Sequence, residues 1–146
     1  MSELAATGPE DRARQMLRLT GRLTELIEQE TALFEARRAS EAEPLQPEKS
    51  RLATIYRRET QLAAKDPARF SGAPEALKAE LRAATQAFEA ALERNGRVVT
   101  ALKAVTEGVV KAIADEAARQ KTAGSGYGPG AAQTGSLGAM ALDRSA

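Results

Sequence analysis

The sequence contains no cysteine, no histidine and no tryptophan among its 146 residues. Without cysteine it has no disulfide, no thiolate nucleophile and no cysteine-ligated zinc. Without histidine it lacks the usual general base and the ligand pattern of di-iron helix bundles. These absences predict a protein that is not an enzyme and that uses no cofactor and no metal ion.

Charge of one sign is also missing, because 21 basic and 20 acidic residues alternate along the chain. Such a mixture solvates helix faces but does not make the basic stripe that a duplex needs. Five aromatic residues are too few for a platform that stacks single-stranded bases. No apolar run approaches the ~18 residues of a membrane span, and residues 1–15 lack a signal-peptide core. We therefore expect a soluble cytoplasmic protein that binds no nucleic acid, enters no membrane and takes no small-molecule substrate.

The residues that are present favour helix as far as about residue 121, since Ala, Leu, Glu, Arg, Gln and Lys dominate. Proline and glycine interrupt this stretch at points that predict helices at about 10–39, 47–65 and 75–121. Six of the eleven glycines then lie between Gly124 and Gly138. We predict a helical bundle over residues 1–121 and a flexible Gly/Ala/Ser-rich tail over residues 122–146.

The third predicted helix has the longest heptad pattern. After Leu77, apolar or small residues follow alternating steps of four and three: Leu81, Ala84, Phe88, Ala91, Asn95, Val98, Leu102, Val105, Val109 and Ala112. The phase is unbroken across Asn95-Gly96, which favours one continuous helix over a left-handed cap at that dipeptide. Asn95 itself has two interpretations: a buried residue that sets helix register, or a capping residue paired with Gly96.

Helix lengths indicate where a partner binds. Short connections predict an all-α, antiparallel, coiled-coil-like bundle of three helices with one long C-terminal helix. At 1.5 Å per residue the third helix is longer than the other two by enough to leave about Leu102 to Gln120 uncovered. An uncovered apolar stripe requires a partner. The predicted partner-binding residues are Leu102, Val105, Val109, Val110 and Ile113.

Two carboxylates, Glu30 and Glu59, fall on apolar faces of the first two helices. Paired carboxylates can perform acid–base chemistry. No nucleophile or metal ligand accompanies them, so we interpret each as lying at the edge of its face or near a helix end and reaching water or an arginine. Arg37, Arg57 and Arg58 are the arginines that the sequence offers.

Four features in order resemble the FlgN-type flagellar export chaperones, in the divergent form found in alphaproteobacteria. They are the Leu-rich stretch from Leu23 to Phe34, the segment Glu48-Lys49-Ser50-Arg51-Leu52, the run from Asn95 to Val110, and Tyr127-Gly128-Pro129. The resemblance implies a cytosolic helical chaperone that binds the C-terminal helices of hook–filament junction proteins. It also implies delivery of these clients to the flagellar type III export apparatus, with client contact at Leu102 through Ile113.

A second hypothesis uses the same stripe differently. In a self-associating coiled coil, either structural or acting as an export escort, the uncovered part of the third helix pairs with a second copy. A monomer in light scattering favours the chaperone, whereas a concentration-independent dimer favours the coiled coil.

Overall fold

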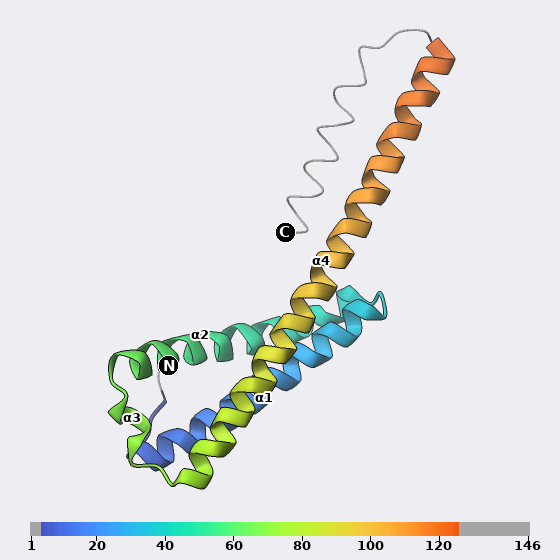
Figure 1. The fold of residues 1–146 in the computed structure, drawn as a ribbon. Helices are drawn as coiled ribbons and strands as arrows, with labels where there is room; N and C mark the ends of the chain where they lie inside the picture. Colours follow the sequence, from blue (N-terminus) through green and yellow to red (C-terminus); the bar gives the residue numbers. More distant parts are fainter. Residues whose placement is uncertain (1–3, 126–146) are drawn as a thin grey trace. The chain divides into compact units, whose positions relative to one another are not determined.

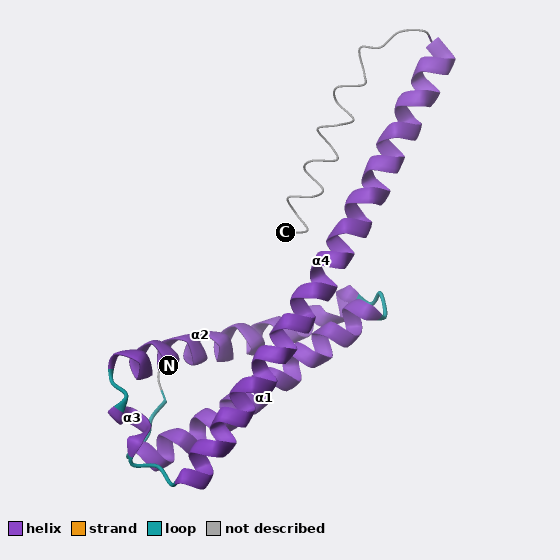
Figure 2. Ribbon diagram, viewed as in Figure 1, coloured by secondary structure: helices purple, strands orange, loops and turns teal. Residues whose placement is uncertain are grey.

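The computed structural model describes residues 4–125, and in this part of the chain every regular element is helical (Figures 1 and 2). The elements are α1 (Pro9–Glu35), the 3-10 helix η1 (Ala39–Leu45), α2 (Gln46–Lys65), the short α3 (Ala68–Ser71) and α4 (Glu75–Ser125). This confirms an all-α fold with one long C-terminal helix. Most of the predicted tail, residues 126–146, lies outside the described residues.

The chain divides into two compact units, Met1–Val98 and Val99–Ala146. The first unit holds α1, η1, α2, α3 and α4 as far as Val98. In the second unit the described residues are the remainder of α4. The boundary after residue 121 was predicted from a change in amino-acid composition, and it stays a prediction.

Helix α1 starts where predicted but ends four residues earlier, at Glu35 rather than at residue 39. Pro9 occupies its first turn, where a missing N–H is harmless. At the other end Arg37 adopts a positive φ of 60°. The Arg38 N–H then donates to the Leu33 carbonyl at 2.8 Å, and the Arg37 N–H donates to the Phe34 carbonyl at 3.1 Å. This is a Schellman motif, which the sequence did not indicate because its left-handed residue is usually glycine.

Helix α2 agrees closely with its predicted range, and Pro47 lies in its first turn as expected. It ends at Lys65, where the Asp66 N–H donates to the Leu62 carbonyl at 2.9 Å and Pro67 follows. The segment leading to α4 contains the four-residue helix α3, which no periodicity in so short a stretch could predict.

Helix α4 is a single helix of 51 residues that runs through Asn95-Gly96. The prediction of a continuous helix is therefore confirmed, and a helix-ending cap at Asn95 is wrong. The helix extends to Ser125, four residues beyond the predicted end, so Gly124 does not terminate it.

The core of the first unit lies where α1, α2 and α4 meet. Figure 1 shows α1 and the first part of α4 side by side in this unit. One cluster joins Leu23 and Ile27 of α1 to Phe88 and Ala91 of α4, with Leu52, Ala53 and Tyr56 of α2 packed against it. The rings of Tyr56 and Phe88 lie 4.7 Å apart and are tilted by 58°. A second cluster joins Ala13, Ala73 and Leu77, with Leu17 and Phe70 beside it.

Candidate functional site

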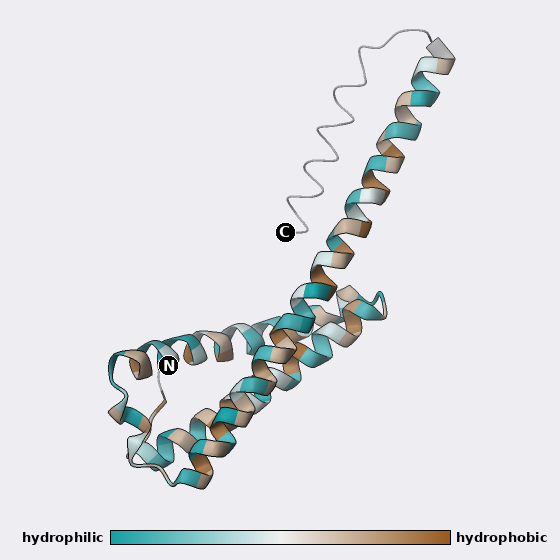
Figure 3. Cartoon of the chain, in the orientation of Figure 1, coloured by the Kyte–Doolittle hydropathy of each residue, from teal (hydrophilic) through white to brown (hydrophobic). Residues whose placement is uncertain are grey.

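The second unit carries exposed apolar side chains along one face of α4. Val105 is 45%, Val109 53% and Ile113 65% exposed, whereas Leu102 and Val110 are partly buried. Figure 3 shows hydrophobic segments recurring at intervals along this half of the helix. The apolar stripe, as we name it, consists of Val99, Leu102, Val105, Val109, Val110 and Ile113. It contains all five residues predicted from the sequence.

Val99 is the residue that the predicted site omitted, although the heptad pattern places it beside the stripe. It is 41% exposed and begins the second unit. The predicted boundary at Leu102 came from comparing expected helix lengths. The expected end of α1 was four residues too late, which moved that boundary toward the C-terminus.

The same heptad face of α4 behaves differently in the two units. In the first unit Leu77, Phe88 and Ala91 on this face are each no more than 7% exposed. In the second unit Val105 and Val109 continue the same alternation of steps and are exposed. Exposed aliphatic side chains at regular helical spacing form a surface suited to another amphipathic helix.

A shallow groove follows the stripe toward the end of α4. It is lined, at successive turns of one helix face, by Val109, Ala112, Ile113, Glu116, Ala117 and Gln120. The small alanine side chains lower the surface between Val109, Ile113 and the longer Glu116 and Gln120. The groove therefore begins apolar and becomes polar toward the C-terminal end of the helix.

Glu30 lies in a polar layer within the first unit and is 4% exposed. Its carboxylate accepts hydrogen bonds from Lys49 Nζ at 2.5 Å and from Gln46 Nε2 at 2.6 Å. Asn95 Nδ2 donates to Glu30 Oε1 and to Thr31 Oγ1, each at 3.0 Å. Burial alone would raise the pKa of Glu30, but these hydrogen bonds outweigh it and hold the pKa below its ordinary value.

This polar layer corrects two interpretations of the sequence. Glu30 is not at an exposed edge, and its charged partner is Lys49 rather than an arginine. Asn95 acts as the register interpretation requires, because its amide pairs with polar groups of α1. Those partners are 64 and 65 residues away in sequence, so no local pattern pointed to them.

Glu59 is fully buried, which also differs from the expected position at a solvated edge. Arg69 Nη2 donates to it at 2.9 Å, the backbone N–H of Leu4 donates at 3.1 Å, and Arg12 Nε lies 4.0 Å away. Its arginines are thus Arg12 and Arg69, not the three that the sequence suggested. The cluster connects α2 to α3 and to the beginning of the chain. Within residues 4–125 no group of three acidic side chains is placed to hold a metal ion.

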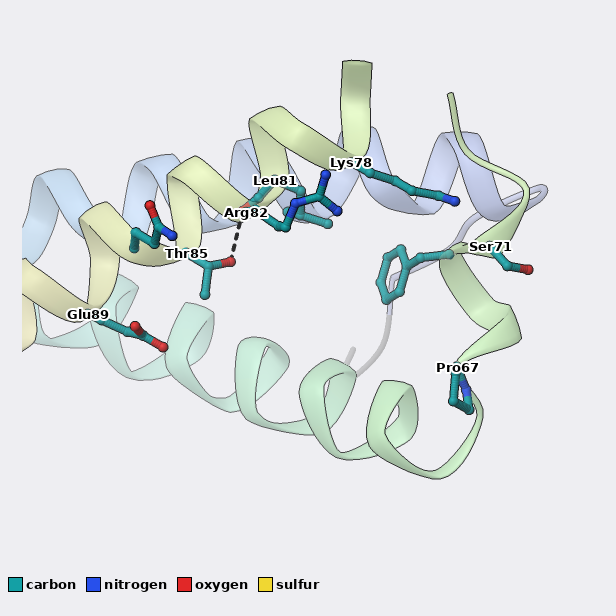
Figure 4. A pocket seen from close by; sticks show the side chains of 9 residues that line it. Pro67, Ser71, Lys78, Leu81, Arg82, Thr85 and Glu89 are labelled. Atoms are coloured by element: carbon teal, nitrogen blue, oxygen red, sulfur yellow. Dashed lines mark hydrogen bonds between the residues drawn. The ribbon is translucent and has the colours of Figure 1, made fainter. Parts of the chain in front are cut away.

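An open pocket of about 610 Å³ lies between α3 and α4 in the first unit (Figure 4). Pro67 and Ser71 line it from one side and Leu81 and Thr85 from the other, while Thr85 Oγ1 donates to the Leu81 carbonyl at 2.8 Å. The remaining lining residues are Phe70, Lys78, Arg82, Gln86 and Glu89. Their charges are mixed, and the pocket brings together no nucleophile and base that would define a reaction.

None of the helices over residues 4–125 is long and apolar enough to cross a lipid bilayer.

Over residues 4–125 the fold and the apolar stripe together define a helical protein whose longest helix exposes an apolar face. Comparison with known proteins gives this class a cellular setting. The chain is 41% identical, over 128 residues, to the flagellar basal-body protein FlbY of Caulobacter vibrioides, and the match covers 87% of this chain and 86% of FlbY. The chain belongs to the FlbY family of flagellum-associated proteins. No model of a known protein family matches it, and no solved structure does.

The flagellar association implied by the sequence resemblance is therefore confirmed. Membership of the FlgN-type export chaperones stays a prediction.

Proposed function

We propose that this protein is a cytoplasmic, non-enzymatic chaperone of flagellum assembly. In this proposal it binds the C-terminal helices of hook–filament junction proteins and delivers them to the type III export apparatus. Its relationship to FlbY supports a role in building the flagellum. The cytoplasmic location follows from the proposed task, since clients are held before export.

The observation that carries the proposal is the exposed apolar stripe of α4. Val105, Val109 and Ile113 are all at least 45% exposed on one helical face. A client helix that covers ~500 Å² of apolar surface gains on the order of 12 kcal/mol before the losses of association are subtracted. Those losses amount to roughly 4–15 kcal/mol, which leaves binding that is reversible. Reversibility is what a protein that delivers its client requires.

We also propose that α1, α2 and α4 up to Val98 form the predicted antiparallel bundle. In the contacts between α1 and α4, residue numbers increase in the same direction along both helices, which supports a parallel pair. In the contacts between α1 and α2 they increase in opposite directions, since Glu30 contacts Lys49 whereas Arg12 contacts Glu59. The pairs that support the α1–α4 direction are Ala13 with Leu77, Leu23 with Phe88, and Thr31 with Asn95.

The first test replaces Val105 and Val109 together by aspartate in the full chain. We expect binding of a purified hook–filament junction protein to fall by at least 100-fold in calorimetry, because two carboxylates would be desolvated at the contact. The helical circular dichroism signal should remain, since both side chains are exposed.

A matched control is Thr100→Asp with Ala104→Asp, which adds the same charge at the same spacing on the exposed far side of the same helix. We expect this variant to bind the client as the wild type does. Equal loss of binding in both variants would contradict a stripe-specific contact.

Self-association is the alternative use of the same surface. In that case light scattering should find a dimer at tens of micromolar, and Val105→Asp with Val109→Asp should convert it to a monomer. The chaperone proposal predicts a monomer before and after the substitutions.

A further inference from the structure

Three glycines, Gly21, Gly96 and Gly108, lie inside helices with nothing within 4 Å of an added Cβ atom, and of these Gly108 is the one that lies between residues of the apolar stripe. Glycine in a helix interior is less stable than alanine by roughly 1 kcal/mol, so it is expected where a positive φ or a close approach requires it. Gly108 lies in regular helix and does not have a positive φ. A Cβ atom added at Gly108 would meet nothing within 4 Å. Neither reason applies within residues 4–125.

The position of Gly108 on the helix gives it a reason outside the chain. It adjoins Val105, Val109 and Ala112 along one edge of the apolar stripe, and Ala101 lies one heptad earlier on the same edge. The opposite edge carries the larger side chains of Val99, Thr106 and Ile113. A partner helix can therefore approach the α4 backbone more closely along the Gly108 edge.

From Val99 to Ile113 the core heptad positions of α4 and the two positions that flank them carry no charge, although Lys103 shares the heptad position of Val110. From Val99 to Ile113 the three charged residues are Lys103, Glu107 and Lys111. In heptad terms, all three fall outside the core positions and the two positions that flank them. Charged residues at the flanking positions usually select the partner of a coiled coil. Because the stripe has none at these positions, we infer that the shape of its surface selects the partner.

We propose that Gly108 is the point of closest approach between α4 and an uncharged, apolar face of a helix from another protein. This inference rests on the proposed function and adds the feature that selects the partner. A bulky partner side chain fits over Gly108, where any Cβ on α4 would hold the two helices apart.

Two observations favour a helix from another protein over a second copy of this chain. The heptad face that packs within the first unit continues into the stripe, so one further amphipathic helix completes the same kind of contact. The stripe is also small. Covering it buries ~1,000 Å² over both partners, below the 1,200–2,000 Å² of standard stable interfaces and well below that of obligate dimers.

The experiment measures calorimetric affinity of the full chain for a purified hook–filament junction protein, with Gly108→Ala, Gly108→Leu and Gly21→Ala. Gly21 is the matched control, because it lies inside α1, is exposed, and also has nothing within 4 Å of an added Cβ. Both alanine variants should increase helicity. We expect Gly108→Ala to weaken binding about 5-fold and Gly108→Leu about 50-fold, with Gly21→Ala unchanged. Wild-type affinity should change less than 3-fold between 50 mM and 500 mM salt, because no interfacial ion pairs are screened.

Wild-type affinity in Gly108→Leu would overturn the close approach. If Val105→Asp with Val109→Asp also binds normally, the proposed function fails as well, so the two failures are distinguishable. A dimer of the free chain that Gly108→Leu dissociates would show that the occupant is a second copy, which also overturns this proposal.

Discussion

At the scale of single residues, polar groups placed on apolar faces are held by partners from other helices. Glu30 loses hydration on burial, and three side-chain donors from α2 and α4 replace the lost water. Leaving one of these groups without a partner would destabilise the fold, because a buried unpaired polar atom costs about 1–3 kcal/mol. These residues therefore specify how the helices align more than they add to the strength of packing.

The lowered pKa of Glu30 makes stability depend on pH. A carboxyl whose pKa is lower in the folded chain than in the unfolded chain stabilises the fold above the unfolded pKa. This contribution is lost as the pH falls through the folded pKa. We expect Glu30→Gln to be less stable than the wild type at pH 7 and the difference to shrink between pH 5 and pH 3. Urea unfolding at each pH measures it.

The pH test needs a control for exposed carboxyls, since the pKa of Glu41 is also lowered, by its hydrogen bond with Arg38. Glu41→Gln removes that exposed pair and should change stability little at any pH. A Glu30→Gln curve parallel to that of the wild type would show that Glu30 does not titrate with unfolding.

Arg37 provides a second prediction at this scale. Its φ of 60° places a side chain in the left-handed region, which glycine adopts without steric strain. We expect Arg37→Gly to raise the free energy of unfolding by about 1 kcal/mol. Arg38→Gly, at the neighbouring residue with a negative φ of −119°, should instead leave stability unchanged or lower it. Thermal unfolding of both variants decides between these outcomes.

At the scale of the elements, α1 carries most of the buried residues whereas α2 buries Glu59 alone among its own. Met16, Leu19, Leu23 and Leu26 recur at alternating steps of three and four along α1, and all four are buried. Leu52, Ile55 and Leu62 of α2 recur with the same kind of spacing, but they are only partly buried. Periodicity reports which side of a helix is apolar, and it cannot report how closely a neighbour covers that side.

This difference between covered and uncovered faces predicts a large effect on stability for one aliphatic truncation and a small effect for another. Leu23 is 1% exposed in the main cluster, so Leu23→Ala should lower the free energy of unfolding by about 3 kcal/mol. Val109 is 53% exposed, and Val109→Ala should change stability by less than about 0.5 kcal/mol. Denaturant midpoints measure both. A large destabilisation by Val109→Ala would mean that the stripe packs within its own chain.

At the scale of the whole molecule, the two units differ in whether their apolar side chains are buried or exposed to solvent. The first unit has clusters that bury side chains from three helices, and the second presents apolar side chains to solvent. A chain in the family of FlbY that keeps such a surface fits a role in handling other flagellar proteins, which is the function proposed above. Because the self-association hypothesis uses this same apolar stripe, measuring the oligomeric state tests that hypothesis.

The sequence by itself determined the helical class, the unbroken course of α4 and the position of its apolar face. These follow from propensity and periodicity, which act between residues a few positions apart. Only the tertiary structure decided the end of α1 at Glu35, the burial of Glu59 among Arg12, Arg69 and Leu4, and the pairing of Asn95 with Glu30. The ion-pair and amide contacts join residues that are 10 to 65 positions apart, and their energies depend on burial that no local pattern records. The Schellman motif differs, because its hydrogen bonds are local but its arginine hides the signal that glycine would have given.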